Sequence, residues 1–144
     1  MHVEGLLKGK GDAVVTITPT SKVGDAVAVL ADRRIGALVV SEDGSRVDGI
    51  LSERDIVRTL AEHGPGLLDH EVASIMTSDV VTCGMATTVD ELSSIMTEGR
   101  MRHVPVVVDG ALVGIVSIGD VVKDRIRDLE VETKTLHEYI AGGR

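Results

Sequence analysis

The 144-residue sequence contains an internal repeat. A Val-Val-Thr segment at residues 14–16 recurs 66 positions later at residues 80–82, and further matches follow at the same spacing. The segment at residues 49–55 recurs at residues 114–120, one position closer, so the second copy has lost one loop residue. Because a period of this length corresponds to one supersecondary unit, the chain is predicted to contain two copies of the same small fold.

Each copy is predicted to fold as strand, helix, strand, strand, helix. In the first copy, β-branched residues predict a strand at residues 14–18. Apolar residues at three-to-four spacing then predict a helix from residue 23 to about residue 33. Two strands, at residues 37–40 and 47–51, flank an Asp-Gly turn. The second helix begins at Ser52 and must end at a Gly-Pro-Gly segment.

The second copy follows the same order and ends in a longer helix. A helix is predicted at residues 88–98, followed by strands at residues 103–107 and 112–116 that are joined by an Asp-Gly turn. The last helix continues toward Tyr139, beyond the point where the first copy stops, and carries an apolar edge. That edge indicates either a contact with a second subunit or a tail helix packed on its own domain.

The predicted fold is of the α/β class. One copy has three strands and two helices, too few to bury both faces of its sheet, whereas two copies facing each other solve this. The two tandem β-α-β-β-α repeats are therefore predicted to pack as one pseudo-twofold module with two clefts. We assign residues 1–70 to the first repeat with its N-terminal segment, and residues 71–144 to the second repeat with its extended C-terminal helix.

Composition and charge disfavour several classes of function. The formal net charge is −8, from 15 basic and 23 acidic residues, which disfavours a nucleic-acid partner. The chain has neither an apolar run of the roughly 18 residues that span a bilayer nor an apolar stretch of signal-peptide length, so we expect no membrane partner and a cytoplasmic location.

The five histidines show no metal-ligand spacing and Cys83 is expected to be a buried, inert thiol, so no metal site is predicted. Since no general base can be placed, the protein is not expected to be an enzyme.

The pattern Gly-apolar-apolar-Ser-x-x-Asp occurs once in each copy, at residues 49–55 and 114–120. One interpretation is a capping box, in which Ser and Asp satisfy the first N–H groups of a helix; the segment from Thr88 has the same pattern without a proposed ligand. The other interpretation is a nucleotide site, because a helix N-terminus favours a phosphate and a carboxylate can accept both hydroxyls of a ribose. Gly49 and Gly114 would let such a ligand approach the backbone. Duplication at symmetric positions favours the ligand site.

The chain resembles a known family, the paired cystathionine-β-synthase (CBS) domain module. The resemblance covers residues 14 to about 126. It rests on the repeat order, on both Gly-x-x-Ser-x-x-Asp segments and on the strand Arg-His-Val-Pro-Val-Val at residues 102–107. It implies two clefts that bind AMP, ADP, ATP, S-adenosyl compounds or NAD(H), and a disc-shaped homodimer.

The resemblance also implies site residues in each cleft. In one cleft Asp120 would bind the ribose, and Ser117 would lie near the phosphate. The adenine would lie there against Val15, Ile35 and Ala37.

In the other cleft Asp55 and Ser52 would take the same two roles. The residues near the base would be Val81, Met101 and His103.

Positive charge distinguishes the two clefts. Arg54 occurs only in the first copy, and Gly119 replaces it in the second, so the cleft beside Arg54 is the preferred phosphate site. Arg102, His103 and Lys10 would add positive charge, and Thr77 is a further candidate ligand residue.

These observations predict a regulatory or sensor module that binds an adenosine nucleotide, AMP, ATP or NAD(H), between its repeats and forms a homodimer. The alternative is a ligand-free module for dimerisation and protein interaction that acts through the C-terminal helix on a partner the sequence does not identify.

Overall fold

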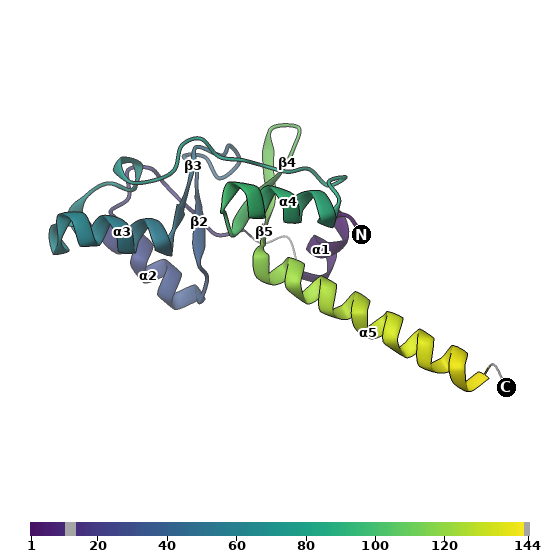
Figure 1. Cartoon of the computed structure of the whole chain (residues 1–144). Helices are drawn as coiled ribbons and strands as arrows, with labels where there is room; N and C mark the ends of the chain where they lie inside the picture. The colour runs from purple at the N-terminus through teal and green to yellow at the C-terminus, as the bar shows by residue number, and fades with distance from the viewer. Residues whose placement is uncertain (11–13, 143–144) are drawn as a thin grey trace.

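The structure is a computed structural model that describes residues 1–10 and 14–142, with the backbone alone for Lys10 (Figure 1). Two groups of strands and helices follow each other along the chain, and a long C-terminal helix projects from the second group (Figure 1). The elements in chain order are α1 (Val3–Lys10), β1 (Thr16–Ile17), α2 (Val23–Arg33), β2 (Ala37–Val40), β3 (Gly49–Ser52), α3 (Glu53–His63), the 3-10 helices η1 (Pro65–Asp69) and η2 (Val72–Ser74), α4 (Val89–Gly99), β4 (His103–Val108), β5 (Ala111–Ser117) and α5 (Ile118–Gly142).

The described strands form two sheets, one in each repeat. In the first repeat the strand order is β1-β2-β3, with β1 parallel and β3 antiparallel to β2. All four residues of β2 are buried, as expected for the central strand of a sheet. In the second repeat β4 and β5 form an antiparallel pair. The predicted α/β class and the tandem organisation are confirmed.

The first strand of each repeat is shorter than the sequence predicts. The strand predicted at residues 14–18 is reduced to the two residues of β1, and the equivalent residues 80–82 are not in a strand. The chain instead joins β4 at Cys83, whose N–H donates to the carbonyl of Pro105 at 3.0 Å and whose carbonyl accepts from the N–H of Val107 at 2.9 Å. β-Branched residues favour an extended backbone in both places, but a strand also needs a neighbour to pair with over its full length.

The helices α2 and α4 occupy equivalent places and match the predicted ranges to within one residue. Each is followed by an arginine in the left-handed backbone region, Arg34 with a φ of 55° and Arg100 with a φ of 54°. In this conformation the arginine N–H turns back to a carbonyl of the last helical turn. The two copies therefore share, at equivalent positions, a backbone conformation that is uncommon for residues other than glycine.

The segment that precedes each repeat packs on the other repeat. We call these the lead segments: residues 1–10, which contain α1, and residues 65–76, which contain η1 and η2. Equivalent hydrogen bonds hold them. The N–H of Val3 donates to the carbonyl of Thr87 at 2.8 Å, and the N–H of Val72 donates to the carbonyl of Ser21 at 2.8 Å. The two repeats are thus interlocked.

The helix α1 lies before residue 14, where no helix or strand is predicted. Glycine lowers helix propensity, and this short helix contains Gly5 and Gly9. Its stability comes from contacts with β5 and α5 of the second repeat, where Val3 and Leu7 are buried.

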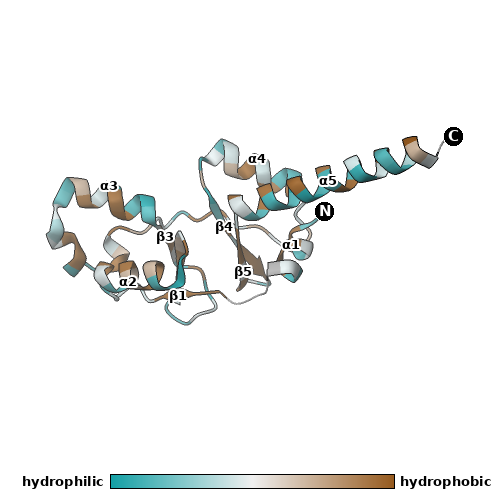
Figure 2. Cartoon of the chain, turned by 90° about the horizontal axis from the view of Figure 1, so that it is seen from below, coloured by the Kyte–Doolittle hydropathy of each residue, from teal (hydrophilic) through white to brown (hydrophobic). Residues whose placement is uncertain are grey.

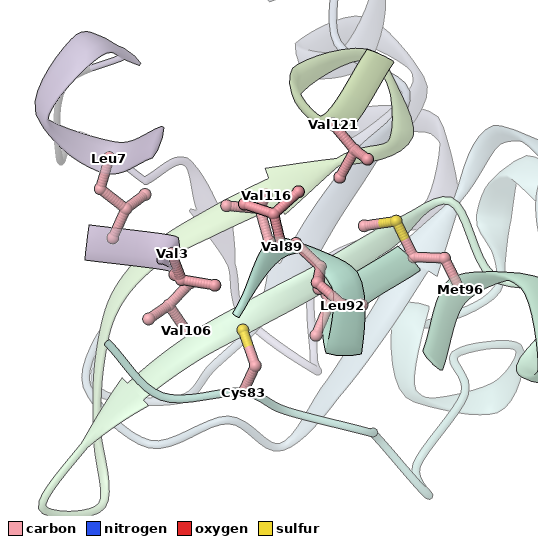
Figure 3. Close-up of a cluster of buried hydrophobic side chains, with 10 residues drawn as sticks. Val3, Leu7, Cys83, Val89, Leu92, Met96, Val106, Val116 and Val121 are labelled. Atoms are coloured by element: carbon pink, nitrogen blue, oxygen red, sulfur yellow. The ribbon is translucent and has the colours of Figure 1, made fainter. Parts of the chain in front are cut away.

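Each repeat has its own cluster of buried apolar side chains. The first cluster contains Ile17, Val23, Ala26, Leu30, Leu38, Val40, Leu51, Ile56, Leu67 and Val72. The second contains Val3, Leu7, Cys83, Val89, Leu92, Met96, Val104, Val106, Val116 and Val121 (Figure 3). Because each cluster includes two side chains from the lead segment of the other repeat, neither core is complete on its own.

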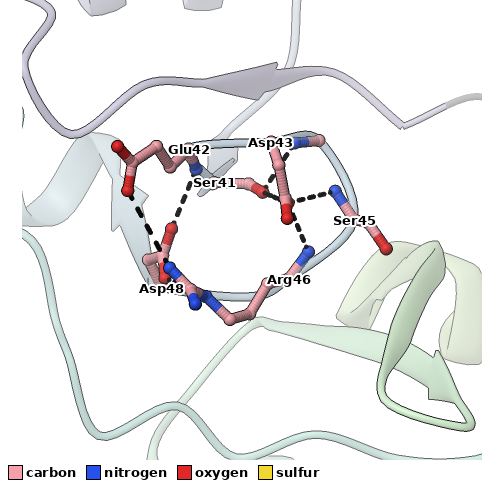
Figure 4. A network of polar contacts seen from close by, with 7 residues as sticks. Ser41, Glu42, Asp43, Ser45, Arg46 and Asp48 are labelled. Atoms are coloured by element: carbon pink, nitrogen blue, oxygen red, sulfur yellow. Dashed lines mark hydrogen bonds and ion pairs between the residues drawn. The ribbon is translucent and has the colours of Figure 1, made fainter.

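Residues 41–48 connect β2 to β3 in a loop that is wider than the predicted Asp-Gly turn (Figure 4). The carboxylate of Asp43 accepts hydrogen bonds from the backbone N–H groups of Arg46 and Ser45, both at 2.8 Å, and these bonds lower the pKa of Asp43. The carbonyl of Ser45 accepts a hydrogen bond from the N–H of Leu112 in β5 at 2.7 Å. The loop therefore joins the first repeat to the second.

The helix α5 is 25 residues long, and only its first turns contact the rest of the molecule, through α4, β5 and α1. Beyond these turns it projects away from both repeats, with apolar and polar segments alternating along it (Figure 2). Within the described ranges, no helix is both long and apolar enough to cross a membrane.

Candidate functional site

A cavity of about 440 Å³ lies between the two repeats. This volume falls in the range of small-molecule sites. The first repeat contributes β2, β3 and the start of α3, the connecting chain contributes residues 77–81, and the second repeat contributes residues 99–103. The lining residues are Gly36, Ala37, Ile50, Ser52, Glu53, Arg54, Asp55, Arg58, Thr77, Asp79, Val80, Val81, Gly99, Arg100, Met101, Arg102 and His103.

Most of the predicted site residues line this one cavity. They are Ala37, Ser52, Arg54, Asp55, Thr77, Val81, Met101, Arg102 and His103. Ala37 lies here because the antiparallel register of β2 and β3 places it opposite Ser52. Ala37, which the resemblance groups with Asp120, lines the cavity that contains Asp55.

The other predicted site residues lie elsewhere. Val15 and Ile35 are half-buried against the core of the first repeat. Ser117, Gly119 and Asp120 lie at the end of β5 and the start of α5, outside the lining of this cavity.

Lys10 ends α1, and its side chain lies outside what the structure describes.

Asp55 combines two roles at the start of α3. The N–H of Ser52 donates to Asp55 Oδ2 at 3.0 Å, and the N–H of Asp55 donates to Ser52 Oγ at 3.2 Å, which completes a capping box. Asp55 Oδ1 accepts from Arg58 Nη2 at 3.1 Å. A carboxylate oxygen has two acceptor positions, so Asp55 Oδ1 retains one for a hydroxyl group in the cavity.

Asp120 repeats the same capping geometry at the start of α5. The N–H of Ser117 donates to Asp120 Oδ2 at 2.8 Å, and the N–H of Asp120 donates to Ser117 Oγ at 3.2 Å. The capping interpretation is thus confirmed in both repeats. The difference between them is that the cavity reaches Asp55 and not Asp120.

The cavity gathers positive charge in an acidic protein. Its charged lining residues are Arg54, Arg58, Arg100, Arg102, Glu53, Asp55 and Asp79. Arg58 is paired with Asp55, whereas the other three arginines form no ion pair within the described part of the chain. Because the net charge of the chain is −8, three unpaired guanidinium groups at one cavity indicate a site for an anion.

Two of these arginines were missing from the predicted site, although the sequence contains a signal for each. Arg58 follows Arg54 by four positions, which places both on the same face of α3. Arg100 corresponds to Arg34 in the repeat, and its left-handed conformation turns the chain from α4 toward Met101 and the cavity.

The glycines of the two motifs serve packing within the protein rather than ligand approach. A Cβ atom at Gly49 would lie 2.6 Å from Met76 Sδ and 2.9 Å from the carbonyl oxygen of Thr77. A Cβ atom at Gly114 would lie 2.8 Å from Cδ2 of Leu7. The lead segments occupy the space that the sequence analysis assigned to a ligand, so that expectation was wrong.

The thiol of Cys83 is expected to be unreactive in the folded protein. It is buried, and burial raises its pKa to about 11. A raised pKa keeps the thiol protonated at pH 8, which lowers the thiolate fraction roughly a hundredfold relative to an ordinary thiol. Alkylation by iodoacetamide at pH 8 should therefore be at least a hundredfold slower in folded than in denatured protein. Equal rates would contradict the burial of this side chain.

Two half-sized α/β repeats with a cavity between them define a tandem-repeat α/β module. The chain matches the CBS domain family at residues 11–62 and again at residues 72–126, and it belongs to that family. Proteins built on such a pair are typically regulatory modules rather than enzymes. The resemblance stated from the sequence is thereby confirmed.

Solved structures share this fold over nearly the whole chain. The CBS-domain-containing protein ATU1752 from Agrobacterium tumefaciens is 48% identical, with a TM-score of 0.84 over 87% of this chain and 99% of that one. The CBS domain protein PAE2072 from Pyrobaculum aerophilum, in complex with AMP, is 29% identical, with a TM-score of 0.77 over 92% and 99% of the two chains. The CBS domain pair of MJ0100, in complex with 5′-methylthioadenosine and S-adenosyl-L-methionine, is 25% identical, with a TM-score of 0.76 over 85% and 98%.

Proposed function

We propose that the protein is a regulatory module that binds an adenosine nucleotide, with AMP, ATP and NAD(H) as candidates, in the cavity beside Asp55. One observation carries the proposal: a single cavity between the repeats combines apolar walls, a buried carboxylate and three arginines without ion-pair partners.

Each part of such a ligand has a matching surface in the cavity. The apolar residues Ile50, Val81 and Met101 suit an adenine ring, and the cavity lining contains no Phe, Tyr or Trp to stack on it. The remaining acceptor position on Asp55 Oδ1 suits a ribose hydroxyl. The N-terminus of α3 and the guanidinium of Arg54 suit the phosphate.

The arginines favour a phosphate over other groups at the 5′ position. The ligands of the two liganded relatives share an adenosine unit and differ in that group, which is a phosphate in one and a thioether or a sulfonium in the other. A sulfonium carries positive charge and would be repelled by Arg54, Arg100 and Arg102, whereas a phosphate would be attracted.

Binding at this place would regulate through the arrangement of the repeats. The ligand would contact β3 and α3 of the first repeat together with residues 99–103 of the second, so it would favour the arrangement in which both sets of contacts are made. A purely regulatory role without catalysis is part of the proposal.

Calorimetry with AMP, ATP and NADH tests the proposal, with adenosine as the ligand that lacks a phosphate. At least one nucleotide should bind, and adenosine should bind at least tenfold more weakly, because a charge-assisted hydrogen bond contributes about 1.5–3 kcal/mol. Arg54→Ala should remove most of that difference, whereas Arg33→Ala, at an exposed arginine outside the cavity, should not. Folded protein that gives no heat with any nucleotide at millimolar concentration would exclude the proposal.

A further inference from the structure

The exposed part of α5 carries an apolar stripe with a regular spacing. Its residues alternate at intervals of four and three positions, which is the heptad spacing of a coiled coil. We call this stripe the α5 seam; it consists of five apolar residues and one threonine, Val122, Ile126, Leu129, Thr133, Leu136 and Ile140. All six are exposed, and the seam extends for about 28 Å along the helix.

The seam faces away from the body of its own chain. The residues of α5 that are buried are Val121 and Asp124, and they lie on a different face of the helix from the seam. Arg125, at the edge of the seam, is held by an ion pair with Asp90 of α4. The first turns of α5 are thereby anchored, which leaves the seam directed outward and unpartnered in the single chain.

The residue types in the seam select one kind of partner. In heptad notation the a positions are Ile126, Thr133 and Ile140, all β-branched, and two of the three d positions are leucines, Leu129 and Leu136. β-Branched residues at a with leucine at d favour a parallel, two-stranded coiled coil. An identical helix from a second copy of the chain meets this requirement.

The charges beside the seam agree with a parallel arrangement. In parallel helices each g position faces the e position five residues later in the partner. This brings Glu132 opposite His137, which would attract it when protonated, and Glu130 opposite Arg125, the residue that also pairs with Asp90 of its own chain. In an antiparallel overlap, Glu130 and Glu132 would each face their own equivalents, and like charges would repel.

We propose that α5 forms a parallel, in-register coiled coil with α5 of a second copy of this chain. Two protomers would then be joined through the α5 seam, with each body attached at the N-terminal end of the coiled coil. This inference goes beyond the proposed function, because the seam lies outside the nucleotide cavity and its residues contribute nothing to it.

Disulfide trapping in ligand-free protein tests the proposal independently of nucleotide binding. In a parallel, in-register pair, Leu136→Cys lies beside its own equivalent, so the single variant should form a disulfide-linked dimer under mild oxidation. Wild-type protein, whose Cys83 is buried, and Glu138→Cys, on the opposite face of α5, should remain uncrosslinked.

An antiparallel pair gives a different pattern and would overturn the proposal. In that arrangement Leu136 faces Ile126 of the other helix, so neither Leu136→Cys nor Ile126→Cys would crosslink alone, and only their mixture would. Failure of all these variants to crosslink, with native circular dichroism, would also overturn it.

A charge placed in the seam tests its role, and the same charge on the far face of α5 is the matched control. Adding Leu129→Asp to the Leu136→Cys variant should reduce crosslinking at least tenfold. Adding Val131→Asp, which changes an equally exposed apolar residue on the far face of the same helix, should leave crosslinking within twofold. Equal effects of the two aspartates would count against a seam of this register.

Discussion

Asp55→Asn is expected to weaken nucleotide binding by about 10- to 100-fold, whereas Asp120→Asn should change it by less than threefold. The expected loss of affinity follows from the hydrogen bonds between a ribose and a charged acceptor, which contribute about 1.5–3 kcal/mol. The contrast follows from position. Both carboxylates cap a helix with the same hydrogen bonds, but the cavity includes only Asp55 in its lining.

The pair of variants separates a loss of ligand contact from a loss of stability. Asparagine retains the shape of aspartate and can still accept a hydrogen bond at the helix start, so each variant should lose only about 1 kcal/mol of folding free energy. Calorimetry with AMP measures binding, and thermal unfolding measures stability. If Asp120→Asn were the variant that loses binding, the nucleotide would lie in the other cleft of the pair, as the sequence alone allowed.

Gly49→Ala is expected to destabilise the protein by about 2–3 kcal/mol, and Gly114→Ala by about 1 kcal/mol or less. The two glycines are equivalent in the repeat, yet they face different neighbours. A methyl group at residue 49 would contact the backbone oxygen of Thr77, which is held by hydrogen bonds with Ile50. The atoms nearest to a methyl group at residue 114 would be those of the Leu7 side chain, which can shift more easily than a backbone oxygen.

A double-mutant cycle identifies the neighbour in each case. Leu7→Ala removes a buried side chain, and the methyl group of Gly114→Ala would partly fill the space that it leaves. The double variant should therefore lose about 1 kcal/mol less folding free energy than the sum of the two single losses. Met76→Ala should give little relief to Gly49→Ala, because the Thr77 oxygen remains. Far-UV circular dichroism in urea is the suitable probe, since the chain has no tryptophan. Equal destabilisation by the two alanines would contradict the described lead-segment packing.

Much of the fold was predictable because its signals are local. The three-to-four spacing of apolar residues places α2 and α4 to within one residue, and Asp109 and Gly110 adopt the positive φ angles that the Asp-Gly turn predicts. The Ser-x-x-Asp pattern likewise predicts the capping hydrogen bonds at Ser52 and Ser117. These features depend on residues within a few positions of each other.

The candidate site was predictable in part. The resemblance to paired CBS domains placed Asp55, Arg54, Val81 and His103 in one cleft, and the cavity contains all of them. It assigned Ala37 to the opposite cleft, because the sequence does not show which side of β2 faces which space.

By itself, the sequence determined the duplication, the order of elements in each copy, and the two acidic caps, since each follows from periodicity or from hydrogen bonds within one turn. Only the tertiary structure decided that each lead segment covers the other repeat and that arginines from both repeats line the cavity that contains Asp55. It also decided that the glycines of the repeated motif face protein instead of ligand. These outcomes depend on distances between residues far apart in the chain, and such distances are set by packing rather than by local preference.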